Sequence, residues 1–114
     1  SAVADAMNMA MGHLFWYRYE QIDATLWYDI VLQVHDAVVL ECPAYCLDWV
    51  CNDVIPTCMG DRVPVYPTGL DGTPRAGGPY HLQVPPPDVF TKWSLPLTKA
   101  DCARLEISES YAAA

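Results

Sequence analysis

The chain has 114 residues, of which 53% are hydrophobic, so it holds enough apolar material for one core but not for several. Its 14 acidic and six basic side chains give a formal charge of −8 at pH 7. A protein that binds nucleic acid alone usually carries a basic patch, whereas the cations here are scattered. This charge argues against an independent nucleic-acid binder. No apolar run approaches the roughly 18 residues of a membrane span, so no membrane partner is expected.

Residues 2–20 have the period of an amphipathic helix, because apolar or long side chains recur at steps of three and four. We expect this stripe to belong to the core, and Gly12 to be tolerated within the helix at a cost of about 1 kcal/mol. The stripe consists of Ala2, Ala6, Met9, His13 and Trp16, with Met7, Met11 and Leu14 beside it.

Residues 28–42 change to an alternating, β-branched pattern with two apolar runs. The segment His35-Asp36-Ala37 separates the runs and suits a tight turn, so the pattern predicts a β-hairpin with Asp36 at or beside its tip. A helix is the alternative for this segment. Pro43 is expected to end the second strand, because proline cannot donate to the ladder.

The segment 44–59 is typical of a short amphipathic helix, which Pro56 is expected to kink or end. Residues 63–66 indicate an edge strand, and a run of turns follows from residue 67. Thr98 is a plausible N-cap of a helix within 98–111, with Asp101 completing a weak capping box. The tail beyond residue 84 is either a docked arm or poorly ordered. The order of elements predicts an α+β fold.

The five cysteines are odd in number, and four of them crowd residues 42–58 at gaps that match no paired zinc spacing. We therefore interpret them as reduced thiols that pack like small hydrophobic side chains. Reduced thiols favour a cytoplasmic location.

Residues 32–36, Leu-Gln-Val-His-Asp, precede Val38-Val39-Leu40-Glu41 and Pro43. This pattern resembles motif C of family A (Pol I-like) DNA polymerases, in which the motif forms a hairpin. The start, Ser-Ala-Val-Ala-Asp, is similar to the family's segment that opens a long palm helix behind that hairpin. The resemblance covers residues 1–72 and implies the C-terminal segment of a phage-like polymerase palm. Residues 73–114 form a Pro/Gly-rich extension that the family does not explain.

The resemblance implies roles for three residues. Asp36 is matched to one of two palm aspartates that hold the catalytic Mg²⁺ ions. His35 is matched to a contact near the primer terminus, and Gln33 to a minor-groove contact with the new base pair. Structural alternatives stay open: Asp36 as a solvated turn residue, and His35 as a strand-end side chain bonded to a carbonyl.

The family usually has glutamate after this aspartate, and Ala37 stands there instead. Either metal affinity is altered or the palm is degenerate. The second aspartate, the fingers and the thumb are missing. The resemblance therefore implies a partner, which is the remaining N-terminal part of the polymerase in the same protein or a separate chain. Primer-template DNA and dNTP are the implied ligands, in a bacterial or phage-infected cell. Ser1 is hypothesised to follow an intein or a split-gene junction, with simple truncation as the competing explanation.

Two other functions are alternatives to a polymerase segment. A metal-dependent phosphohydrolase with a His-Asp pair would enlist His13 and Asp101, but such enzymes place the pair on helices. A non-catalytic interaction module that kept the palm fold is the other alternative, and Ala37 supports it.

Overall fold

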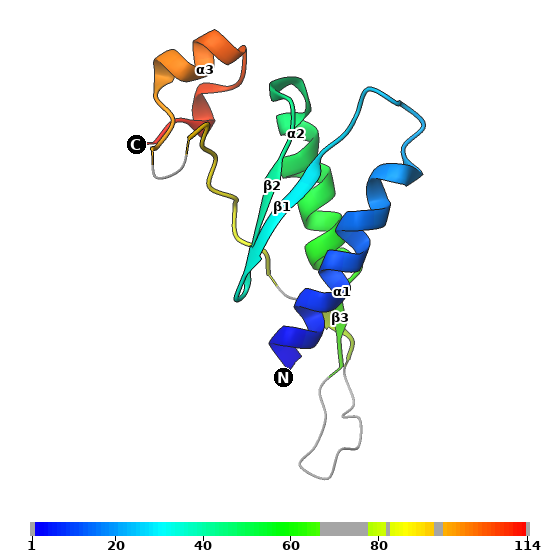
Figure 1. The fold of residues 1–114 in the computed structure, drawn as a ribbon. Coiled ribbons are helices and arrows are strands. Elements are labelled where there is room, and N and C mark those ends of the chain that lie inside the picture. Colours follow the sequence, from blue (N-terminus) through cyan, green and yellow to red (C-terminus); the bar gives the residue numbers. More distant parts are fainter. Residues whose placement is uncertain (1, 67–77, 82, 93–94, 114) are drawn as a thin grey trace.

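The computed structural model describes residues 2–66, 78–81, 83–92 and 95–113, and it has the expected mixture of helices and antiparallel strands (Figure 1). Ser1 and the run of turns at 67–77 lie outside these residues. Helix α1 spans Ala2–Tyr17 and continues as a 3-10 turn, Arg18–Glu20. Strands β1, Asp29–Val34, and β2, Ala37–Glu41, form an antiparallel hairpin. The hairpin prediction is therefore confirmed.

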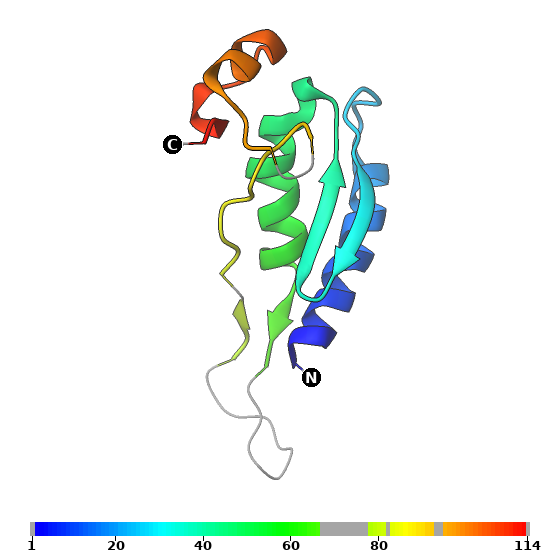
Figure 2. The same ribbon diagram turned by 60° about the vertical axis from the view of Figure 1, so that its left-hand side comes forward.

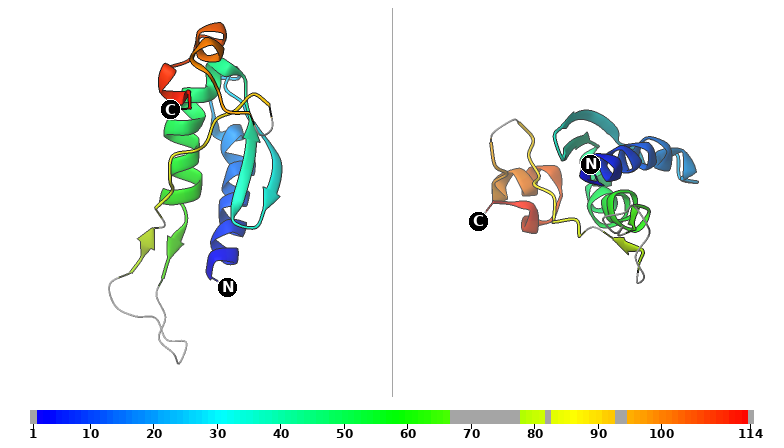
Figure 3. Two further views of the ribbon diagram at one scale, coloured as in Figure 1. Left: turned by 90° about the vertical axis from the view of Figure 1, so that its left-hand side faces the viewer. Right: turned by 90° about the horizontal axis from the view of Figure 1, so that it is seen from below.

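A second helical segment follows the hairpin and runs antiparallel beside α1 (Figures 2 and 3). It begins with the 3-10 turn Ala44–Cys46, continues as α2, Leu47–Trp49, and then contains the π-helical stretches Val50–Val54 and Thr57–Asp61. We call the whole segment the second helix. One face of the hairpin lies across both helices, and the main core fills the space between these layers. The core consists of Leu14, Tyr28, Cys46, Val50, Val54 and Cys58, with Ile30, Val38 and Leu40 of the hairpin packed against it.

The buried face of α1 differs from the expected one. Ala6, Met7, Ala10 and Leu14 are buried. Met9 and Trp16 were expected in the core but are 44% and 64% exposed, so that part of the prediction is wrong. Two rows of side chains on α1 have helical spacing, and the row that meets the second helix is the one through Ala6, Ala10 and Leu14. The side chain of Ala2 lies outside the described part of the chain.

The second helix passes through Pro56, so of the two expected outcomes, a kink or an end, the end is wrong. π-helical stretches lie on both sides of Pro56. Pro56 has φ −60° and ψ −37°, which are helical angles. Backbone bonds on both sides reach five residues back, from the Ile55 N–H to the Val50 carbonyl and from the Arg62 N–H to the Thr57 carbonyl. These wider π turns accommodate a ring that would otherwise clash with a carbonyl one turn earlier.

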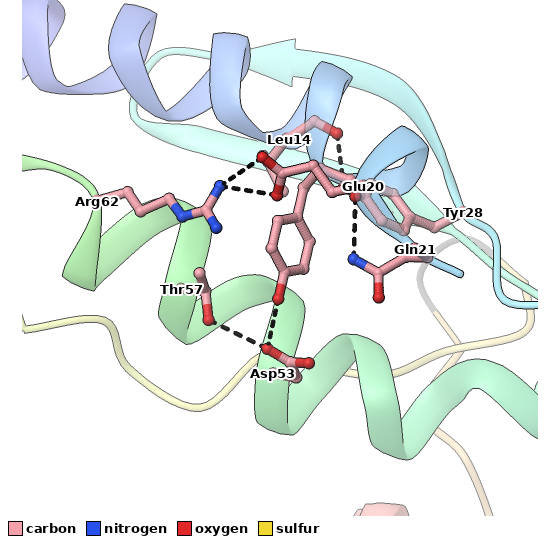
Figure 4. A network of polar contacts seen from close by, with 8 residues as sticks. Leu14, Glu20, Gln21, Tyr28, Asp53, Thr57 and Arg62 are labelled. Carbon is pink, nitrogen blue, oxygen red and sulfur yellow. Dashed lines mark hydrogen bonds and ion pairs between the residues drawn. The ribbon is translucent and has the colours of Figure 1, made fainter. Parts of the chain in front are cut away.

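Polar contacts join α1 to the second helix (Figure 4). The Tyr17 hydroxyl donates to Asp53 Oδ1 at 2.9 Å, and the Thr57 hydroxyl donates to the same oxygen at 3.1 Å. Burial, together with the Asp53 carboxylate, raises the pKa of Tyr17. Arg62 forms an ion pair with Glu20, in which Nη1 donates to both carboxylate oxygens, at 3.1 and 2.9 Å. Its guanidinium also lies 4.9 Å from the centre of the Tyr17 ring.

The described C-terminal residues form a docked arm. The predicted edge strand is β3, Pro64–Val65, and it pairs with β4, Tyr80–His81, which the sequence did not indicate. Helix α3, Lys99–Leu105, begins at the predicted capping box. The Thr98 backbone N–H donates to Asp101 Oδ2 at 3.0 Å, and the Asp101 backbone N–H donates to Thr98 Oγ1 at 3.1 Å. The Tyr111 hydroxyl donates to Asp48 Oδ1 at 2.5 Å and so holds the arm on the second helix.

The cysteines pack as predicted from the sequence. Cys46, Cys58 and Cys102 are buried, Cys42 and Cys51 are half-buried, and all five thiols are free. Burial raises the pKa of Cys42 to about 11 and that of Cys58 to about 12.

No helix among the described residues is long and apolar enough to cross a bilayer.

The raised thiol pKa values predict slow alkylation of the folded chain. At pH 8 both Cys42 and Cys58 stay protonated, and thiolate is the reactive form. We expect maleimide to label Cys58 much more slowly in the native chain than in urea, measured over time by mass spectrometry of the peptide that contains Cys58. Rapid labelling of native Cys58 would contradict the packing described here.

Gly12 offers a direct test of the helix. A Cβ at this position would meet nothing within 4 Å. We expect Gly12→Ala to raise the free energy of unfolding by about 0.5–1 kcal/mol, because alanine loses less backbone entropy in a helix. Urea denaturation at low protein concentration measures this change. A destabilised variant would show that α1 is not a regular helix at this position.

Candidate functional site

The hairpin tip brings together all three site residues that the sequence predicted. Val34 pairs with Ala37, so the loop consists only of His35 and Asp36. Gln33 is the penultimate residue of β1 and pairs with Val38. The side chains of the three predicted residues are all exposed. The Asp36 carboxylate therefore lies at the tip of a short, tight turn and is open to an incoming ligand.

His35 has a left-handed backbone with φ 54°. A positive φ at the first central residue suits the twist of a two-residue hairpin loop, and glycine is the usual residue there. Histidine is among the non-glycine residues that are enriched in this region, although it retains some steric cost. The Gln33 amide donates to the His35 carbonyl at 3.5 Å, which is a weak contact. Backbone strain at a polar tip is a physical pointer to function rather than to stability.

The two faces of the hairpin differ. Ile30, Val38 and Leu40 pack on the helices, whereas Leu32 and Val34 of β1 are 40% and 45% exposed. The register shifts between Ile30 and Leu32, and Val31 in that bulge is 50% exposed. Among the described strands, β1 pairs only with β2, which leaves its other edge without a strand. A sheet edge lined by apolar side chains is normally covered by another part of a protein.

Asp36 suits a magnesium ion in chemistry but supplies only part of a site. A carboxylate oxygen is a ligand that Mg²⁺ prefers, and this one is exposed. Within the described ranges, no group of three His, Cys, Asp or Glu side chains is arranged to hold a metal. The other acids of the hairpin are Asp29 and Glu41, which lie opposite each other in the strand register. They are at the far end of the hairpin, roughly 20 Å from Asp36 by strand geometry. A complete Mg²⁺ site at Asp36 would need more oxygen ligands than this one carboxylate supplies.

Ala37 occupies the position where the resemblance leads one to expect glutamate. It is the first residue of β2, directly opposite Val34, and it is exposed. The side chain at this position therefore supplies no acid beside Asp36.

The phosphohydrolase alternative does not fit the hairpin. His35 and Asp36 lie in a turn between strands, whereas those enzymes place the pair on helices. His13 lies on α1, and the Asp101 carboxylate accepts from the Thr98 backbone at the start of α3. That bond lowers the pKa of Asp101, so a capping role accounts for its environment.

Sequence reasoning missed one surface. Phe15, Trp16 and Tyr19 form an exposed aromatic group at the end of α1, with ring centroids 5.0 to 6.1 Å apart. The run of adjacent aromatic residues at 15–17 and 19 was a visible signal, because one helix face cannot bury all of them.

Comparisons of the chain with protein families, with curated proteins and with solved structures found no match.

The left-handed turn can be tested by a pair of variants. We expect His35→Gly to be more stable than His35→Ala by about 1 kcal/mol, because only glycine adopts positive φ without a Cβ penalty. Thermal or urea unfolding of the two variants measures this difference directly. Equal stabilities would show that residue 35 does not hold a left-handed conformation in solution.

Proposed function

We propose that this chain is the C-terminal palm segment of a family A DNA polymerase, and that it supplies a metal-binding aspartate for template-directed nucleotidyl transfer. The observation that carries the proposal is the two-residue tip, where Asp36 follows a left-handed His35 and Gln33 lies two residues before it. The same residues carry the resemblance to motif C. The order of α1, hairpin and second helix also agrees with a palm segment.

Asp36 is the residue assigned to the metal. A hairpin whose base is packed on two helices holds its tip in a defined place, so the carboxylate needs no rearrangement to accept a cation. Bound Mg²⁺ would supply Lewis-acid polarisation and neutralise charge on the transferred phosphoryl group. Asp36 contributes one hard oxygen ligand to that task, and a carboxylate of the upstream palm contributes the other.

His35 and Gln33 are positioning residues in this proposal. Both side chains are exposed on the same end of the hairpin as Asp36, where a primer terminus would lie. The imidazole donates to backbone atoms of the primer. The Gln33 amide bonds in the minor groove, where correct base pairs present similar acceptors, so the contact senses pairing geometry without reading sequence.

The partner in this function is the upstream part of the polymerase, with its fingers and thumb. Val31, Leu32 and Val34 leave an apolar strand edge that such a part would cover. The formal charge of −8 also requires another polypeptide to supply most of the positive surface for primer-template DNA. A cytoplasmic location agrees with the free thiols.

Primer extension tests the proposal. A family A polymerase that is truncated just before its own motif C hairpin and the preceding palm helix would be combined with this chain, a labelled primer-template, dNTPs and Mg²⁺. We expect Mg²⁺-dependent extension that Asp36→Asn lowers by about a hundredfold or more, as expected when an electrostatic transition-state contact is lost. Asp61→Asn is the matched control, because Asp61 is also exposed but lies at the end of the second helix. This variant should extend normally.

The opposite result would favour the interaction module. If the two parts form a stable complex, measured by sedimentation, but extension is absent or equal in wild type and Asp36→Asn, the catalytic assignment is wrong. Ala37 supports that alternative, since the tip lacks the usual second acid.

A further inference from the structure

The C-terminal arm runs beside the second helix and is fixed on both sides of residues 83–92, which we call the strap (Figures 2 and 3). Before the strap, β4 pairs with β3, which follows shortly after the second helix ends. After it, the Ala113 N–H donates to the Leu97 carbonyl at 2.9 Å, and Tyr111 is bonded to Asp48 of the second helix. The strap is therefore held next to the second helix from both ends.

Proline limits how far the strap can collapse onto the helix. Pro85, Pro86 and Pro87 are consecutive, and Pro96 follows the strap. Each ring fixes φ and removes a backbone donor, and consecutive prolines favour a stiff, extended backbone. A cavity of about 880 Å³ lies between the strap, the end of the arm and the second helix. A stiff wall of this kind keeps such a cavity open before a ligand arrives.

The cavity has the size and the walls of a small-molecule site. Such sites are usually about 300–1,000 Å³ in volume and mostly apolar, with a few polar groups. Phe90 and Leu95 line the cavity and are 38% and 57% exposed, so they offer apolar surface to a ligand. Asn52 of the second helix and Asp88 of the strap are polar members of the lining, and both are exposed. Other apolar members are Ile55, Pro56, Val84, Val89 and Leu97.

The charged residues in the described lining are all acids. Asp61 and Asp88 line this cavity, whereas no lysine, arginine or histidine does so among the described residues. A second cavity of about 500 Å³ shares residues 87–90 of the strap, and its charged members in the described chain are Glu41 and Asp88. Asp88 has no hydrogen-bond or ion-pair partner within the described ranges. Unpaired carboxylates in a chain of formal charge −8 attract cations and repel anions.

We propose that the cavity under the strap binds an organic cation with a bulky apolar body. The body covers the apolar wall that includes Ile55, Phe90 and Leu97, and the cationic group lies beside the Asp88 carboxylate. A wholly apolar ligand would leave this carboxylate without a counter-charge, and an anion would be repelled by it. The inference goes beyond the proposed polymerase function and does not rest on it, because the described lining contains no residue of the hairpin tip.

Isothermal titration calorimetry of the full chain with tetraphenylphosphonium tests the inference. Tetraphenylborate is the matched ligand, because it carries the same four phenyl groups around an anionic centre. We expect one phosphonium ion to bind per chain, with a dissociation constant at least tenfold lower than that of the borate.

Two pairs of variants locate the cation. Asp88→Asn should raise the dissociation constant of the phosphonium about tenfold, whereas Asp5→Asn, at an exposed acid of α1, should leave it unchanged. Asn52→Arg places a cation in the wall and should raise the constant tenfold or more. Asn8→Arg makes the same change at an exposed position of α1 and should have no effect. Arginine is a good helix former, so circular dichroism should show both arginine variants folded.

Three results would overturn the inference. The first is no phosphonium binding up to about 1 mM, and the second is equally tight binding of the borate. The third is binding that either Asp88→Asn or Asn52→Arg leaves unchanged, because the cation would then lie elsewhere, such as on the exposed rings of Phe15, Trp16 and Tyr19. Primer extension depends on the hairpin tip and not on this cavity, so the two proposals fail separately.

Discussion

Tyr28 joins the three layers of this fold at one point. Its side chain is fully buried, its ring lies 5.6 Å from that of Trp49 on the second helix, and its hydroxyl donates to the Leu14 carbonyl of α1 at 2.6 Å. The residue directly precedes β1, so this single side chain determines where the hairpin begins relative to both helices. Burial raises the pKa of the phenol, which keeps the hydroxyl protonated as a donor at neutral pH. This contact acts together with Ile30, Val38 and Leu40, which pack the hairpin on the core.

A two-stranded hairpin is marginally stable on its own in water. Here Ile30, Val38 and Leu40 bury one face of it on the core, whereas the opposite face and the edge of β1 have no cover among the described residues. Stability therefore comes from the helical side, and the exposed side is left for other molecules.

Local chemistry accounts for what the sequence predicted well. Alternation on both sides of His35 and Asp36 indicated the hairpin, and the Thr98–Asp101 pair indicated the start of α3, because both signals involve only near neighbours. The continuation of the second helix through Pro56 depends on π turns that no short-range rule anticipates. The buried side of α1 depended on which of two helical rows meets the second helix, and only the packed structure decides that. For the candidate site, the predicted hairpin already placed Gln33, His35 and Asp36 at one end. The left-handed backbone of His35 could not be predicted from the sequence.

The length of the hairpin loop restricts how this protein can evolve. Because Val34 pairs directly with Ala37, a deleted residue between them would shift the register of β1 against β2, and an inserted residue would either shift it or enlarge the loop. Side chains alternate between the faces of a strand, so such a shift would turn either Ile30 or both Val38 and Leu40 away from the core. Point substitutions at positions 35 and 36 alter only the exposed tip. Substitutions at the tip therefore change its exposed chemistry without changing the register, and position 35 favours residues that tolerate a positive φ.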